Sequence, residues 1–162
     1  DRTPAMGRRG LISLAALDAA YYGQGRIDWW VFAAQLRRDG WLNPDDARTL
    51  ALRGWFGVLI GNSDMHLGNA SLLLSDTRPL ALAPSYDMLP MALRPASSGE
   101  VVAREIPVLV PLPEQLVDWR AAAQMADDFW RRVGDEAAIS AGFRSIAASQ
   151  LARLEAAINR FG

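Results

Sequence analysis

The chain has 162 residues, of which 51% are hydrophobic and 22% are charged, a balance that excludes a disordered or collagen-like protein. Seventeen basic and 18 acidic residues leave a net charge of −1, which argues against direct binding of nucleic acid by electrostatic attraction. The absence of cysteine excludes thiolate metal sites, cysteine nucleophiles and disulfides.

The first third of the chain is predicted to form helices. Ser13 can cap a helix over residues 14–22, and Asp28 can cap a second helix over residues 29–39. A glycine follows each of these segments and favours the end of the helix there.

The segment Asn43-Pro44-Asp45-Asp46 predicts the start of a third helix, because a capping amide is followed by proline and two acids. Apolar residues then recur at intervals of three and four, as on a core-facing helix that ends near Gly61. Two short apolar runs, 71–74 and 80–83, predict a small β-hairpin. Because an isolated hairpin is only marginally stable, we expect it to lie against helices.

The C-terminal part is predicted to be helical over residues 116–133 and again over 136–161, with a break near Gly142. The stretch 94–99, rich in proline, serine and glycine, is either a linker or a loop that faces a substrate. The predicted fold class is therefore mostly α with a small β-hairpin, and we treat residues 1–162 as one domain. No apolar stretch is long enough to span a membrane.

Polar residues that could take part in catalysis or bind a metal gather between the third helix and the segment that follows the hairpin. Asp64 precedes Asn69 by five residues, and Asp87 follows the hairpin. Carboxylate and amide oxygens are ligands that Mg²⁺ prefers, and a further carboxylate can accept a proton from a hydroxyl nucleophile. Protein kinases use the same five-residue spacing between the catalytic aspartate and a metal-binding asparagine. This pattern favours a phosphoryl-transfer site.

The stretch 55–89, WFGVLIGNSDMHLGNASLLLSDTRPLALAPSYDML, resembles the catalytic core of HipA-type serine/threonine kinases. The resemblance implies that Asp64 is the catalytic base and that Asn69 and Asp87 hold Mg²⁺. It also implies that His66 braces the loop and that Tyr86 supports Asp87 by packing or by a hydrogen bond.

By the same resemblance, the chain would be the C-terminal lobe of a protein-kinase-like fold that uses ATP and Mg²⁺. The substrate would be a protein with a serine or threonine acceptor, in a bacterial, cytoplasmic, toxin-like kinase. A DNA-binding antitoxin, or a fused helix-turn-helix segment, would be its partner. The opening Asp1-Arg2 resembles the end of the family's F-D-R strand.

The nucleotide-clamping half of a kinase is not found in this sequence. All 17 basic residues are arginine, and no glycine-rich phosphate loop is present, whereas kinases carry both a lysine and such a loop in the N-terminal lobe. We therefore expect a fragment of a longer protein that needs the N-terminal lobe. By itself the fragment would be inactive, would bind ATP very weakly at most, and could self-associate through its exposed apolar surface.

Other interpretations of these residues stay open. The chain could be a non-catalytic module in transcriptional or toxin–antitoxin control, or a Mg²⁺-dependent phosphohydrolase that uses the same acids. The six tryptophans are expected to pack in the core rather than to stack on a ligand. The arginine pairs 8–9, 37–38 and 131–132 are expected on the solvated surface.

Overall fold

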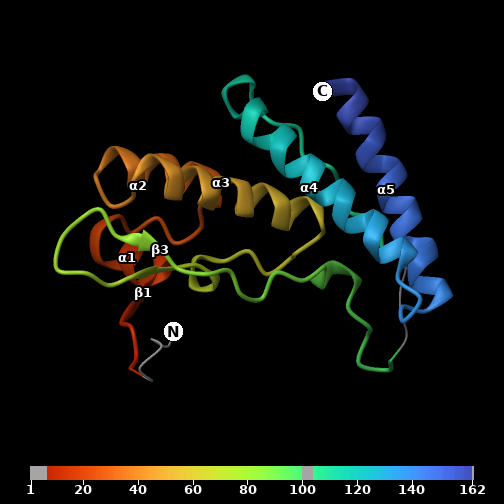
Figure 1. Ribbon diagram of the computed structural model, residues 1–162, viewed down its shortest axis with the longest axis horizontal. Helices are drawn as coiled ribbons and strands as arrows, with labels where there is room; N and C mark the ends of the chain where they lie inside the picture. The colour runs from red at the N-terminus through yellow and green to blue at the C-terminus, as the bar shows by residue number, and fades with distance from the viewer. Residues whose placement is uncertain (1–6, 100–103, 162) are drawn as a thin grey trace. The chain divides into compact units, whose positions relative to one another are not determined.

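The structure is a computed structural model that describes residues 7–99 and 104–161. The chain divides into two compact units, the first made of residues 1–54 and 64–88, the second of residues 55–63 and 89–162. The predicted counterpart of the F-D-R strand lies outside the described residues. Figure 1 shows the helices and strands in chain order.

The three predicted N-terminal helices are present as α1 (Leu14–Tyr21), α2 (Trp29–Arg38) and α3 (Pro44–Leu59). The Ser13 hydroxyl accepts a hydrogen bond from the Ala16 N–H at 3.1 Å and so caps α1. The Asn43 amide oxygen accepts one from the Asp46 N–H at 2.8 Å at the start of α3. Asp28 stands at the N-cap position of α2, but its side chain makes no capping hydrogen bond.

The predicted hairpin is part of a larger sheet. Strands β2 (Ser71–Leu73) and β3 (Ala81–Leu82) pair antiparallel, and β1 (Leu11–Ser13) pairs antiparallel with the other edge of β2. Leu72 at the centre lies opposite Ile12 on one side and Leu82 on the other. The predicted hairpin is confirmed, and β1 is a third strand that the sequence did not indicate, because three residues that end at a helix cap are too few to show strand periodicity.

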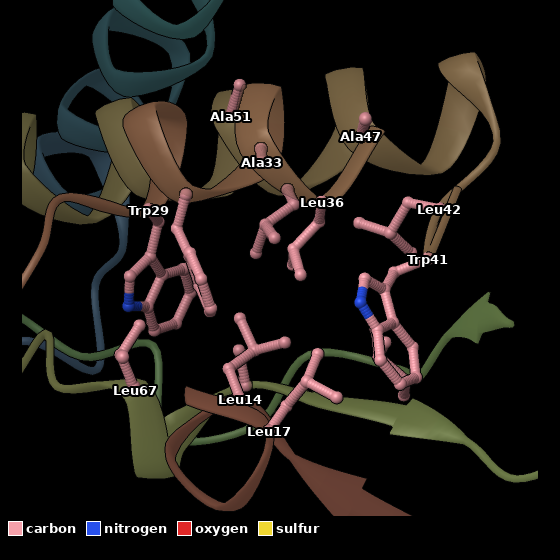
Figure 2. Packing of buried hydrophobic residues seen from close by; sticks show 14 of the residues in the cluster. Leu14, Leu17, Trp29, Ala33, Leu36, Trp41, Leu42, Ala47, Ala51 and Leu67 are labelled. Carbon is pink, nitrogen blue, oxygen red and sulfur yellow. The ribbon is translucent and has the colours of Figure 1, made fainter. Parts of the chain in front are cut away.

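The core of the first unit is made by α1, α2, the first turns of α3 and the sheet. Leu14 and Leu17 of α1 lie between the indole rings of Trp29 and Trp41 (Figure 2), and all four side chains are buried. Leu72 of β2 belongs to the same cluster and is fully buried. The hairpin therefore packs against helices, as predicted.

The second unit contains α4 (Leu116–Asp135) and α5 (Ala141–Phe161), which form an antiparallel helical hairpin, and the short 3₁₀ helices Met91–Leu93 and Pro113–Gln115 (Figure 1). The break between the long helices lies over residues 136–140, just before its predicted position near Gly142, so that α5 begins at Ala141 and not at residue 136 as predicted. The Arg144 guanidinium donates to the carbonyl of Ile139 at 2.6 Å and holds the connection, while Gly142 lies in the first turn of α5.

The expected locations of the tryptophans and arginine pairs are confirmed. Five tryptophans are buried and the sixth, Trp30, is half-buried, as core packing requires. The arginine pairs 8–9, 37–38 and 131–132 are exposed. Within the described ranges, no helix is both long and apolar enough to cross a bilayer.

Candidate active site

The loop between α3 and the sheet folds back on itself through Asp64 and Asn69. The Asn69 amide nitrogen donates to the backbone carbonyl of Asp64 at 2.9 Å and to its carboxylate Oδ2 at 3.3 Å. Half of the Asp64 side chain (54%) is exposed, so the carboxylate can be reached from solvent. With its nitrogen turned to Asp64, the Asn69 amide presents its oxygen Oδ1 elsewhere as an acceptor. The predicted base and the predicted metal-binding amide are therefore neighbours.

His66 lies inside this loop and caps the 3₁₀ helix η1 (Leu67–Asn69). Its ring nitrogen Nδ1 accepts a hydrogen bond from the Gly68 N–H at 3.0 Å, which leaves the proton of a neutral imidazole on Nε2. Nε2 lies 3.6 Å from Oδ1 of Asp64. A Cβ atom on Gly68 would stand 2.8 Å from the imidazole, so this capping geometry requires glycine. These are the contacts of a bracing residue.

Tyr86 joins the loop before the sheet to the segment after it. Its hydroxyl donates to the carbonyl of Gly68 at 2.8 Å and lies 3.2 Å from the hydroxyl of Ser71. Because the Tyr86 proton is given to Gly68, the hydrogen bond between the two hydroxyls is donated by Ser71. The Tyr86 hydroxyl thus holds the 64–69 loop, and its predicted support of the neighbouring Asp87 stays a prediction.

Asp87 adopts a left-handed backbone conformation, with φ of +56°. Aspartate and asparagine enter this region more readily than most residues, but at a cost in free energy. Tyr86 and Met88, on either side of Asp87, line one small cavity together with Asn69. The segment that carries Asp87 therefore runs beside the Asn69 end of the 64–69 loop, within the same unit.

Two residues of α3, for which no site role was predicted, also contact this segment. The Arg53 guanidinium donates to the carbonyl of Ala83 at 2.7 Å, and Oδ2 of Asp46 accepts from the N–H of Leu82 at 3.2 Å. Burial lowers the pKa of Arg53, and the Asp46 carboxylate partly offsets this effect. A lone cation in an otherwise apolar stretch of the helix is the sequence signal that could have identified Arg53.

Two of the predicted site residues carry oxygen donors of the kind that could hold a magnesium ion. Asn69 Oδ1 and the Asp87 carboxylate are hard oxygen donors, and two protein ligands with phosphate and water are the usual set for Mg²⁺. Among the described residues, no group of three or more acids, histidines or cysteines forms an all-protein metal cage.

Comparison with known proteins identifies what the chain is similar to. A family model described as "HipA-like C-terminal domain" matches residues 1–158. The chain is 41% identical over 110 residues to "Toxin YjjJ" of Escherichia coli, and this match covers 66% of the chain and 25% of the toxin. A stretch of 34 residues, 21% of the chain, is 59% identical to "Putative kinase Y4dM" of Sinorhizobium fredii and covers 8% of it. The chain therefore spans at most about a quarter of these relatives.

Proposed function

This chain belongs to the HipA-like C-terminal domain family, and we propose that the protein that carries it is an ATP-dependent serine/threonine protein kinase. Its helices and small antiparallel sheet form the kinase-like fold of that family. One relative is named "Toxin YjjJ" and another "Putative kinase Y4dM", and both names support the proposal for the longer protein.

The observation that carries the proposal is the closed loop of Asp64 and Asn69. The amide nitrogen of Asn69 orients the Asp64 carboxylate through Oδ2, while Oδ1 of Asp64 faces His66. In this role Asp64 accepts the proton of the attacking serine or threonine hydroxyl and aligns that hydroxyl with the phosphorus. Positioning of this kind supplies most of the catalysis in phosphoryl transfer, because no covalent enzyme intermediate is needed.

Asn69 and Asp87 would hold Mg²⁺ through Oδ1 and the carboxylate. When bound, the ion supplies neutralisation of charge on the phosphate oxygens. The lysine and the glycine-rich loop that clamp ATP in kinases would come from an N-terminal lobe, because this chain contains no lysine.

The test separates the two roles in the full-length protein. Asp64→Asn keeps an oxygen that can accept from Asn69 but removes the carboxylate that acts as the base. Transfer from radiolabelled ATP should therefore fall at least about 100-fold, while Mg-ATP affinity changes less than about twofold. Asp87→Asn should weaken both, because it removes a charged ligand. Asp76→Asn, an exposed aspartate in the turn between β2 and β3, is the matched control.

Each other outcome points to another function. An equal loss of ATP affinity in the Asp64 and Asp87 variants would contradict the assignment of base and ligand. ATP hydrolysis without protein phosphorylation would favour a phosphohydrolase. A full-length protein that neither hydrolyses nor transfers phosphate would favour a non-catalytic regulatory module.

We extend the proposal to the cellular setting, in which the full-length protein acts in the bacterial cytoplasm as a toxin restrained by a DNA-binding antitoxin or by a fused helix-turn-helix segment. Induced expression should then arrest growth of a bacterial host, and Asp64→Asn should abolish the arrest at equal protein level. If the wild-type protein and the Asp64→Asn variant arrest growth to the same extent, toxicity does not depend on phosphoryl transfer.

A further inference from the structure

The segment that leads to Asp87 is held at two successive residues by a single helix. The N–H of Leu82 donates to Asp46, and the carbonyl of Ala83 accepts from Arg53. Asp46 and Arg53 are seven residues apart on α3, which is close to two turns, so both lie on the same face of the helix. The N–H of Ala83 donates in turn to the carbonyl of Ser71 at 2.9 Å. Ala83 is therefore fixed through both of its backbone polar groups.

The same segment is fastened again on both sides of Asp87. Before it, the Tyr86 hydroxyl donates to the carbonyl of Gly68 in the 64–69 loop. After it, the Met88 side chain packs against the core of the first unit. Asp87 itself keeps a left-handed backbone with φ of +56°, which a free loop would relax. Asp87 thus lies between two neighbours that are both fastened to the first unit.

Arg53 occupies a place that packing by itself does not explain. It is half-buried between apolar neighbours on α3, where removing a guanidinium from water carries a cost. Burial lowers the pKa of Arg53, as expected for a partly desolvated cation. With Asn69, Tyr86 and Met88 it lines a small cavity that has room for about one water molecule. An apolar side chain would fill such a place at lower cost, which indicates a role for its hydrogen-bond donors.

We propose that Arg53 is a positioning residue that sets the place of Asp87 relative to Asn69 by holding the carbonyl of Ala83. This inference rests on the proposed function, in which Asp87 and Asn69 share one metal ion. Arg53 touches neither substrate nor metal in this role. It fixes the origin of the segment 84–87, and the Tyr86 hydroxyl fixes the end of that segment.

The experiment uses the full-length protein with Arg53→Met, which keeps an apolar stem but removes the donors. Arg37→Met, at an exposed position on α2, is the matched control for the same chemical change. Two quantities are measured, the Mg²⁺ concentration for half-maximal transfer and the hydrogen–deuterium exchange of peptides that cover residues 82–88. Exchange needs neither ATP nor activity.

For Arg53→Met we expect the half-maximal Mg²⁺ concentration to rise about tenfold, as for loss of one charge-assisted hydrogen bond. Exchange over 82–88 should rise while exchange over α1 stays unchanged, and Arg37→Met should alter neither quantity. Arg53→Lys retains a charged donor and should restore part of the Mg²⁺ dependence. If Arg53→Met does not fold, the test is made with Arg53→Lys, whose half-maximal Mg²⁺ concentration should lie above that of the wild-type protein by less than about tenfold.

Two results would overturn the inference. One is faster exchange over the whole first unit with an unchanged Mg²⁺ requirement, which would make Arg53 an ordinary stabilising residue. The other is unchanged exchange over 82–88. If the wild-type protein transfers no phosphate, the proposed function fails, and the exchange data by themselves then decide whether Arg53 positions the segment.

Discussion

The hydroxyl of Tyr86 offers the sharpest test of how the site is held together. Tyr86→Phe keeps the ring and removes an oxygen that donates to Gly68 at 2.8 Å and accepts from Ser71 at 3.2 Å. A typical hydrogen bond contributes about 0.5–1.5 kcal/mol to stability, so two bonds set an upper range of about 1–3 kcal/mol. The Tyr86 side chain is 42% exposed, and water can replace part of the lost bond to Gly68. We therefore expect a loss of about 1.5 kcal/mol.

The coupling between the two hydroxyls can be isolated with a double-mutant cycle. Ser71 is only 7% exposed, so its hydroxyl finds little water once Tyr86 loses its oxygen. Ser71→Ala and Tyr86→Phe should then show a coupling energy of about 0.5–1 kcal/mol, because the second substitution removes a bond that the first has already broken.

Urea unfolding monitored by tryptophan fluorescence measures these changes. The urea concentration at the midpoint of unfolding should fall, while the slope of the free energy of unfolding against urea concentration stays unchanged. Tyr21→Phe is the control: its ring is 62% exposed, and in the described part of the chain its hydroxyl makes no hydrogen bond, so stability should stay within about 0.5 kcal/mol. A coupling energy indistinguishable from zero would refute the hydroxyl–hydroxyl bond, and with it the link between the Asp87 segment and the sheet.

The remaining predictions concern stability and the chain by itself. Gly61→Ala should lower the free energy of unfolding in urea by about 2–4 kcal/mol, because Gly61 has a φ of +78° and a Cβ atom there would stand 2.4 Å from the buried Ile106 side chain. Gly23→Ala is the control: Gly23 has a φ of +68° but open space around it, so the loss should be only about 1 kcal/mol. Equal losses for the two variants would contradict the clash with Ile106. Burial and the hydrogen bond to Asp39 raise the pKa of Tyr22 from 10.0 to about 12, so the folded chain holds the phenol proton more tightly than the unfolded chain. The contribution of the Tyr22 phenol to the free energy of unfolding is therefore complete below pH 10 and is lost as the pH rises toward 12. Tyr22→Phe should flatten that decline in a series of unfolding curves, and an unchanged decline would assign it to other groups. The 162-residue chain by itself should transfer no phosphate and show at most very weak Mg-ATP binding by calorimetry, because it contains no lysine; micromolar affinity would show that the nucleotide site is misplaced.

Local signals in the sequence were sufficient for most of the secondary structure. Capping side chains act within one turn of the helix they start, so Ser13 and Asn43 could be identified from their neighbours. The hairpin was visible for the same reason, since two apolar runs flank a polar turn. The third strand, β1, was not visible, because its partner β2 lies about 60 residues further along the chain and only that pairing defines it.

The candidate site divides in the same way. The sequence by itself determined that Asp64 and Asn69 are close, because five residues of loop bring the two side chains together. It could not show that the Tyr86 hydroxyl reaches Gly68 or that Arg53 holds Ala83, since these contacts join residues 18 and 30 positions apart. Such contacts depend on where the sheet packs against α3, which is decided by burial of the shared core. The physical reason is the range of the forces: capping and loop closure act locally, whereas hydrophobic packing selects distant partners only when the whole unit folds.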